Sequence, residues 1–151
     1  MSKVIRYRKL LGVEKTAGLQ ELKTIYRSFM KEWHPDKFQH DNEALQAAEL
    51  KSKAFIEAYH FLVSIAPETV AEALPAYTST ITGANIADIN YKGNTLQLSF
   101  DDGNSYEYYE VPHNTYVKLV NADSRGRFAR RHICSSFVYR NISKMMAAAE
   151  Q

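Results

Sequence analysis

The hydrophobic pattern of this chain changes its period near residue 85, and no single element of secondary structure satisfies both periods. Up to residue 66, apolar residues recur at three- and four-residue steps, as on one face of a helix. Beyond residue 85, apolar and polar residues alternate, as on a strand with one face in water. The 151 residues therefore predict two small domains of different class, and they exclude a large barrel or a multidomain enzyme.

Residues 1–66 predict an all-α domain, built as a hairpin of two long helices with a shorter helix packed across it. The short helix is expected to end at Gly12, because glycine suits the left-handed position after a helix. Gly18 and Asn42 are the expected N-caps of the long helices, and Pro35 ends the first of them. The apolar faces are Leu22, Ile25, Tyr26, Phe29 and Trp33 on the first long helix, and Leu45, Ala48, Phe55, Tyr59 and Leu62 on the second.

The rest of the chain predicts a linker at residues 67–84 and an α+β domain at residues 85–151. The linker is small and polar toward its end, and a short helix before Pro75 is compatible with its sequence. In the second domain, a three-stranded antiparallel meander is expected, with tight turns and a following helix. The strands are expected at residues 85–91, 95–100 and 105–111, and the helix at residues 112–120.

Between the two long helices lies the segment Trp33-His34-Pro35-Asp36-Lys37. Around it stand Leu11-Gly12-Val13, Lys15-Thr16-Ala17, Tyr26, and Ala58-Tyr59 followed by Leu62. In this combination, residues 4–66 resemble the J-domain family, the co-chaperones of the DnaJ type. The resemblance implies that His34, Pro35 and Asp36 contact a DnaK-type chaperone ATPase near its interdomain linker and accelerate ATP hydrolysis.

The chemistry of the tripeptide agrees with this role. Asp36 offers a carboxylate to an arginine of the partner, and Pro35 restricts the loop, so that less conformational entropy is lost on binding. The alternative is that the tripeptide only makes an interhelical turn, with His34 capping a helix.

A basic stripe, Lys23, Arg27 and Lys31, is spaced by four residues on the first long helix, away from its apolar face. On an arbitrary helix, such a stripe is a solvated surface. The resemblance implies instead that it docks, together with Tyr26, on acidic residues of the chaperone ATPase, raising the association rate. Ser28 and Glu32 stand where the family is often basic, which predicts a weaker field.

Catalysis, a cofactor and a metal site are not expected. His34, Asp36 and His40 lie close in sequence, but one loop offers no third ligand of known geometry. Cys134 is the one cysteine, which excludes an internal disulfide and a multi-cysteine zinc site. No apolar run reaches the ~20 residues of a membrane helix, and the start lacks the apolar stretch of a signal peptide. A cytoplasmic, non-enzymatic protein is expected.

The net charge of +2 conceals a segregation of charge along the chain. Residues 1–66 carry a net charge of +3, residues 67–110 carry −6, and residues 111–151 carry +5. The densest basic cluster runs from Arg125 to His132. This segregation points to charged partners, although the total charge is close to zero.

Residues 84–141 resemble the small KTSC domain, which is named for the C-terminus of some lysyl-tRNA synthetases and also occurs alone in bacteria. The residues that carry the resemblance are Asn85-Ile86-Ala87, Tyr91, Leu96, Phe100, Gly103, Tyr106, Tyr108, Val111-Pro112, Tyr116, Ala122, Ser124, Gly126, Phe128, Ile133 and Tyr139. For this family RNA binding has been suggested.

RNA binding by this half would combine aromatic and basic side chains. Tyr106 and Tyr108, on one strand face, would stack unpaired bases. The arginines that would hold the phosphates are Arg125, Arg127, Arg130 and Arg131. The alternative is that the tyrosines supply the core and that the arginines pair with Asp101, Asp102, Glu107 and Glu110.

The sequence as a whole favours a J-domain co-chaperone that stimulates a DnaK-type ATPase. Its C-terminal half would bring the client protein or the complex on which the chaperone acts. The alternative function is an RNA-binding or translation-associated adaptor in which the J-like half serves as a scaffold.

Overall fold

The computed structural model describes residues 2–149, and their contacts divide the chain into two compact units. The first unit comprises residues 3–71, and the second begins at residue 72. Each unit buries a core of its own.

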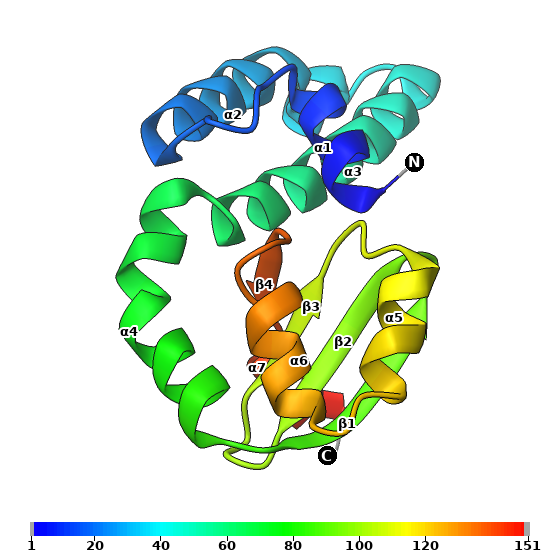
Figure 1. Cartoon of the computed structure of the whole chain (residues 1–151). Helices are drawn as coiled ribbons and strands as arrows, with labels where there is room; N and C mark the ends of the chain where they lie inside the picture. Colours follow the sequence, from blue (N-terminus) through cyan, green and yellow to red (C-terminus); the bar gives the residue numbers. More distant parts are fainter. Residues whose placement is uncertain (1, 150–151) are drawn as a thin grey trace. The chain divides into compact units, whose positions relative to one another are not determined.

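The first unit is helical, as predicted (Figure 1). Its elements are α1 (Lys3–Leu11), α2 (Leu19–Trp33), the 3-10 helix η1 (Pro35–Phe38) and α3 (Asn42–Ser64). The helices α2 and α3 form the expected hairpin, and α1 packs on α3. A further helix, α4 (Pro67–Gly83), begins in this unit and continues into the second one.

Three of the four predicted helix ends in the first unit are confirmed, namely those at Gly12, Gly18 and Pro35. Gly12, after α1, has φ +71°, and its N–H donates to the carbonyl of Lys9 at 3.2 Å. Gly18 is the N-cap of α2. Asn42, however, is the first residue of α3, and Asp41 is its cap: Asp41 Oδ1 accepts hydrogen bonds from two backbone amides, those of Glu43 and Ala44, both at 3.1 Å.

The interface between α2 and α3 is a series of stacked aromatic rings. Tyr26 stacks on Tyr59 with 4.3 Å between ring centroids, and Phe29 stacks on Phe55 with 3.8 Å. Leu22, near the start of α2, is buried. These contacts confirm the apolar face predicted for α2, in which Tyr26, Phe29 and Trp33 are half-buried.

The segment expected to be a linker is helical up to Gly83, because α4 continues through Pro75. Pro75 does not end the helix, because residues that follow it make tertiary contacts. Tyr77 and Thr80, one turn apart, are 3% and 2% exposed and pack into the second unit. Burial of these two side chains outweighs the local preference of the sequence for an irregular linker.

The second unit contains a four-stranded antiparallel sheet with the strand order β1-β2-β3-β4. Its strands are β1 (Ile86–Lys92), β2 (Thr95–Phe100), β3 (Ser105–Tyr108) and β4 (Tyr139–Asn141). The predicted meander is confirmed, although β3 ends at Tyr108, before the expected residue 111. The sequence did not reveal β4, which has three residues and pairs Tyr139 with Tyr108.

The tight turns predicted for the meander are present, and each contains a residue with positive φ. Gly93 and Asn94, between β1 and β2, have φ values of 56° and 64°, and Gly103, between β2 and β3, has φ 90°. These left-handed residues allow each strand to pair directly with the next one.

The core of the second unit lies on one face of the sheet. The helices α5 (His113–Val120) and α6 (Arg125–His132) lie across this face (Figure 1), and the C-terminal half of α4 contributes Tyr77 to the same core. The fully enclosed side chains include Leu96, Leu98, Val111, Leu119 and Ile133. The helix α7 (Ser143–Ala149) contacts Gln97, whose side chain alternates with Leu96 and Leu98 and so lies on the opposite face.

Candidate functional site

The His34-Pro35-Asp36 tripeptide occupies the junction between α2 and η1. His34 caps α2, its N–H donating to the carbonyl of Met30 at 3.0 Å, and its ψ of 132° takes the chain out of the helical region. Pro35 causes this change of direction, because the residue before a proline is disfavoured in the helical conformation. Pro35 then occupies the first position of η1, where no amide donor is needed. The prediction that Pro35 ends α2 is confirmed.

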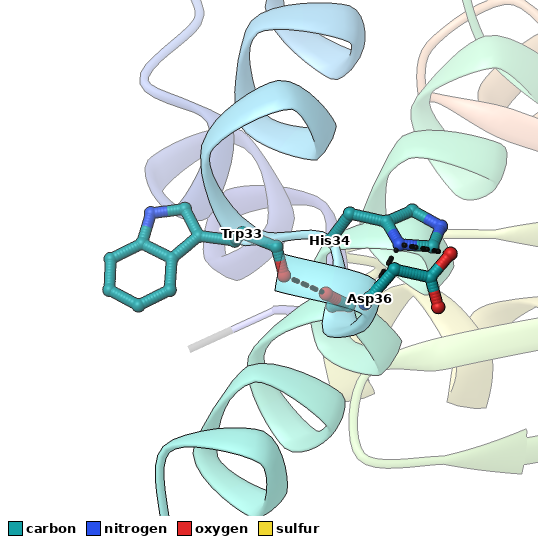
Figure 2. A network of polar contacts seen from close by, with 4 residues as sticks. Trp33, His34 and Asp36 are labelled. Carbon is teal, nitrogen blue, oxygen red and sulfur yellow. Dashed lines mark hydrogen bonds and ion pairs between the residues drawn. The ribbon is translucent and has the colours of Figure 1, made fainter. Parts of the chain in front are cut away.

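The side chains of His34 and Asp36 lie against each other in Figure 2. The backbone N–H of Asp36 donates to His34 Nδ1 at 3.1 Å, and Asp36 Oδ2 lies 3.5 Å from the same nitrogen. A nitrogen that accepts a hydrogen bond carries no proton, so the geometry assigns the proton of the neutral imidazole to Nε2. His34 thus presents an Nε2–H donor on a side chain that is 45% exposed, beside a carboxylate that is 76% exposed.

The capping role considered as an alternative for His34 is present in the structure. His34 Nδ1 caps the first turn of η1 by accepting from Asp36. Capping uses only this nitrogen, however. The Nε2–H group of His34 and the carboxylate of Asp36 remain accessible for a partner, so capping and binding are compatible.

The predicted basic stripe lies along the exposed surface of α2. Lys23, Arg27 and Lys31 are exposed, whereas Tyr26 is half-buried against Tyr59. Within residues 2–149, no carboxylate lies at ion-pair distance from the three basic side chains. Their charge is therefore available to an acidic surface.

Beside the tripeptide is an open groove that the sequence did not reveal. It is lined by Met30, His34, Pro35, Glu49, Ser52, Lys53, Ile56 and Glu57. The predicted apolar faces included neither Met30 nor Ile56, and both are half-buried in the structure.

The prediction that Tyr106 and Tyr108 stack bases is wrong for this structure. Tyr106 is 3% exposed and Tyr108 is fully buried, because β3 lies between two strands and its tyrosine face is covered by helices. The alternative, that these tyrosines form the core, is what the structure shows. Base stacking on this face would require the core to open.

Polar atoms buried in this core are joined in a network. Tyr77 Oη donates to the carbonyl of Cys134 at 2.7 Å and lies 2.9 Å from Tyr108 Oη. Burial raises the pKa of Tyr77 and of Tyr108 far above the usual value for a tyrosine, and it also raises the pKa of the Cys134 thiol. The tyrosine hydroxyls are neutral donors of the core, and Cys134 Sγ accepts from Tyr108 Oη at 3.6 Å.

The four arginines proposed to hold phosphates all lie on α6, at Arg125, Arg127, Arg130 and Arg131, and all are exposed. Arg125 Nη2 donates to the carbonyl of Val120 at 3.1 Å, and Arg130 Nη1 donates to that of Ile81 at 3.2 Å. In the described part of the chain, none of the four forms an ion pair with a carboxylate. The alternative pairing with Asp101, Asp102, Glu107 and Glu110 is therefore not found.

Two features are absent from the described residues, a metal-binding cluster and a membrane-spanning helix. Among residues 2–149, no group of three or more histidine, cysteine, aspartate or glutamate side chains is arranged to hold a metal ion. No helix in the same range combines the length and apolarity needed to cross a membrane.

Comparison with known protein families agrees with both units. The family model described as DnaJ domain matches residues 6–66, which include the tripeptide, the basic stripe and the stacked rings of α2 and α3. The first unit is a J-domain. The family model described as KTSC domain matches residues 83–137, so the second unit is a KTSC domain.

Relatives of both kinds are found among curated proteins. "Chaperone protein DnaJ" of Mesomycoplasma hyopneumoniae is 46% identical over 55 residues, which cover 36% of this chain and 15% of the relative. "DnaJ homolog subfamily B member 6" of Bos taurus is 37% identical over 59 residues, 39% of this chain and 23% of the relative. "Lysine--tRNA ligase" of Nostoc sp. is 41% identical over 49 residues, 32% of this chain and 9% of the relative. The chain thus spans less than a quarter of the length of these relatives.

Proposed function

We propose that this protein is a co-chaperone whose J-domain binds a DnaK-type ATPase and stimulates its ATP hydrolysis. The observation that carries the proposal is the geometry of the tripeptide. His34 and Asp36 present a donor and a carboxylate side by side on a loop that a proline and two helix caps restrain. A restrained loop loses less conformational entropy when it binds a partner.

Each part of the proposed surface has its own task. The carboxylate of Asp36 would take a charge-assisted hydrogen bond from an arginine of the ATPase, and the Nε2–H group of His34 would donate to an acceptor beside it. Lys23, Arg27 and Lys31 would steer an acidic patch of the partner onto α2, an effect that weakens with salt. Tyr26 would contribute its exposed edge between them.

The KTSC domain would select the client protein or complex on which the ATPase acts. Its separate core and its exposed cluster of arginines on α6 support a role as an independent binding module. The proposed compartment is the cytoplasm, which suits an unpaired, buried Cys134.

The test is single-turnover ATP hydrolysis by purified DnaK-type ATPases of the source organism, with and without the protein. His34→Gln should lower the stimulated rate at least tenfold while the J-domain stays folded. His40→Gln is the matched control, because it makes the same substitution at an exposed histidine nearby. Failure of the unaltered protein to stimulate any of these ATPases, or full stimulation by His34→Gln, would reject the proposed role.

A second candidate function, RNA binding by the KTSC domain, is favoured by one observation. The arginines of α6 are exposed and lack carboxylate partners within the described residues, as is typical of side chains that contact phosphates. Because Tyr106 and Tyr108 are buried, binding would rest on the phosphate backbone and would show little preference for base sequence.

This second function is tested by retention of single-stranded RNA at low and high salt. Replacing Arg127 and Arg131 with alanine should reduce retention, because these two arginines form no hydrogen bond to the backbone through their guanidinium groups in the described part of the chain. The control replaces Lys9 and Lys15, exposed residues of the J-domain, and changes the net charge equally. Absence of retention at low salt would remove RNA from the candidate partners.

A further inference from the structure

Ser52 is a polar residue on the buried face of α3. It is 3% exposed, and it lies in the same row of buried positions as Ala48 and Phe55. Its hydroxyl donates to the backbone carbonyl of Trp33 at 3.1 Å, the dashed contact beside Trp33 in Figure 2. Trp33 is the last residue of α2 and directly precedes His34.

The carbonyl of Trp33 needs a partner from outside α2. In a continuing helix its donor would be the N–H of Lys37, but the chain leaves the helix at His34, and the N–H of Lys37 donates to the carbonyl of His34 at 3.0 Å. The Ser52 hydroxyl supplies the missing donor. The hydroxyl and the carbonyl satisfy each other's hydrogen-bonding requirement in a partly buried place, where leaving either group without a hydrogen bond would cost free energy.

The residue beside Ser52 holds the same tryptophan by its ring. Lys51 Nζ lies 3.6 Å from the centroid of the Trp33 ring, within the range of a cation–π interaction. Phe38 of η1 stacks on this ring with 6.0 Å between centroids. Adjacent residues of α3 thus fix both the backbone and the side chain of the residue that precedes the tripeptide.

We propose that Ser52 is a positioning residue, whose buried hydroxyl sets the direction in which His34, Pro35 and Asp36 leave α2. Its effect on ATPase stimulation rests on the proposed function. Its effect on the loop does not, because every contact involved lies within the J-domain.

The loop is tested by nuclear magnetic resonance of the full chain. The first readout is the exchange rate of the Asp36 amide proton, whose hydrogen bond is accepted by His34 Nδ1. The second readout is the set of ¹⁵N shifts of the His34 ring, which report its tautomer. Ser52→Ala should raise the exchange rate about fivefold, the factor expected for one net hydrogen bond, and shift the ring signals toward a mixture of tautomers. Ser52→Cys, of similar shape but a weaker donor, replaces the alanine variant if that variant unfolds.

Ser64→Ala is the matched control, since the Ser64 hydroxyl donates to the carbonyl of Phe61 at the other end of α3. This variant should leave both signals of the loop unchanged. Equal signals in Ser52→Ala and the unaltered protein, or equal changes in the two alanine variants, would overturn the proposal.

The ATPase assay separates this proposal from the proposed function. Ser52→Ala should raise the protein concentration needed for half-maximal stimulation about fivefold and leave the maximal rate unchanged, because the tripeptide itself is intact. If the unaltered protein stimulates no DnaK-type ATPase, the proposed function fails, and the exchange rate of Asp36 still decides whether Ser52 positions the loop.

Discussion

The carboxylate of Glu68 accepts a hydrogen bond from the backbone N–H of Leu19, which lies 49 positions earlier in the chain, with Oε2 and N 3.0 Å apart. Leu19 is the first residue of α2, whose N-cap, Gly18, has no side chain to cap the helix. Glu68, in the first turn of α4, does so instead and places a negative charge at the positive end of α2. A residue of the predicted linker therefore completes the helix that carries the basic stripe.

Replacing Glu68 with alanine should destabilise the J-domain by about 1 kcal/mol, the usual value of a helix N-cap. Trp33 is the one tryptophan of the chain, so its fluorescence in urea reports unfolding of this domain. Glu72→Ala, which removes the same charge one turn later from an exposed position, should change the midpoint little. Equal midpoints for the two variants would show that the contact with Leu19 has no effect on stability.

Gly18→Ala should remove the same contact from the other side. A Cβ at this position would lie 2.9 Å from Oε2 of Glu68 and 3.0 Å from Oε1, so the carboxylate must move away from Leu19. The backbone conformation of Gly18, with φ −92° and ψ 179°, suits alanine, which leaves the displaced carboxylate as the main cost. In the Glu68→Ala background, Gly18→Ala should therefore lower the free energy of unfolding by less than it does in the unaltered protein. A double-mutant cycle by urea unfolding measures the difference.

The features predicted from sequence are those with a local cause. Gly12 ends α1 because its own backbone permits positive φ, and Pro35 ends α2 because its ring constrains the preceding residue. The position of the tripeptide followed from these two signals and the helical period. For α3, the cap predicted at Asn42 was one residue too late, because the backbone geometry, which the sequence does not show, makes Asp41 the cap.

The features missed depend on contacts between distant residues. The continuation of α4 past Pro75 is stabilised by burial of Tyr77 and Thr80, which no local pattern encodes. Alternation along β3 placed Tyr106 and Tyr108 on one face, but it could not show that helices cover that face. Ser52 was missed for the same reason, since its partner lies 19 residues away.

The KTSC domain should lose stability above pH 10. Tyr77 and Tyr108 have pKa values raised by burial, so the unfolded chain releases their protons at the ordinary tyrosine pKa, near 10, while the folded chain retains them. Stability from this source is complete below pH 10 and falls as the pH rises, by about 1.4 kcal/mol per tyrosine and pH unit. Urea unfolding at pH 8 and pH 11, followed by amide signals of β2, measures this loss.

Tyr108→Phe isolates the contribution of one hydroxyl. The variant loses the contact between Tyr108 Oη and Tyr77 Oη, so it should be less stable at pH 8. It should also lose less stability between pH 8 and pH 11, because one titrating group is gone. An unchanged loss would show that ionisation of Tyr108 does not limit stability in alkali.

Glu110→Gly should stabilise the KTSC domain by roughly 0.5–1 kcal/mol. Glu110 has φ +61°, a left-handed conformation that costs a residue with a Cβ more than it costs glycine. The conformation is imposed by its neighbour, because Val111 is fully buried and its N–H donates to the carbonyl of Asn94 at 2.8 Å. Glu110→Ala removes the same exposed carboxylate but keeps the Cβ, so it should leave stability nearly unchanged. Equal urea midpoints for the glycine and alanine variants would show that backbone strain at this position is negligible, and a higher midpoint for glycine alone would measure it.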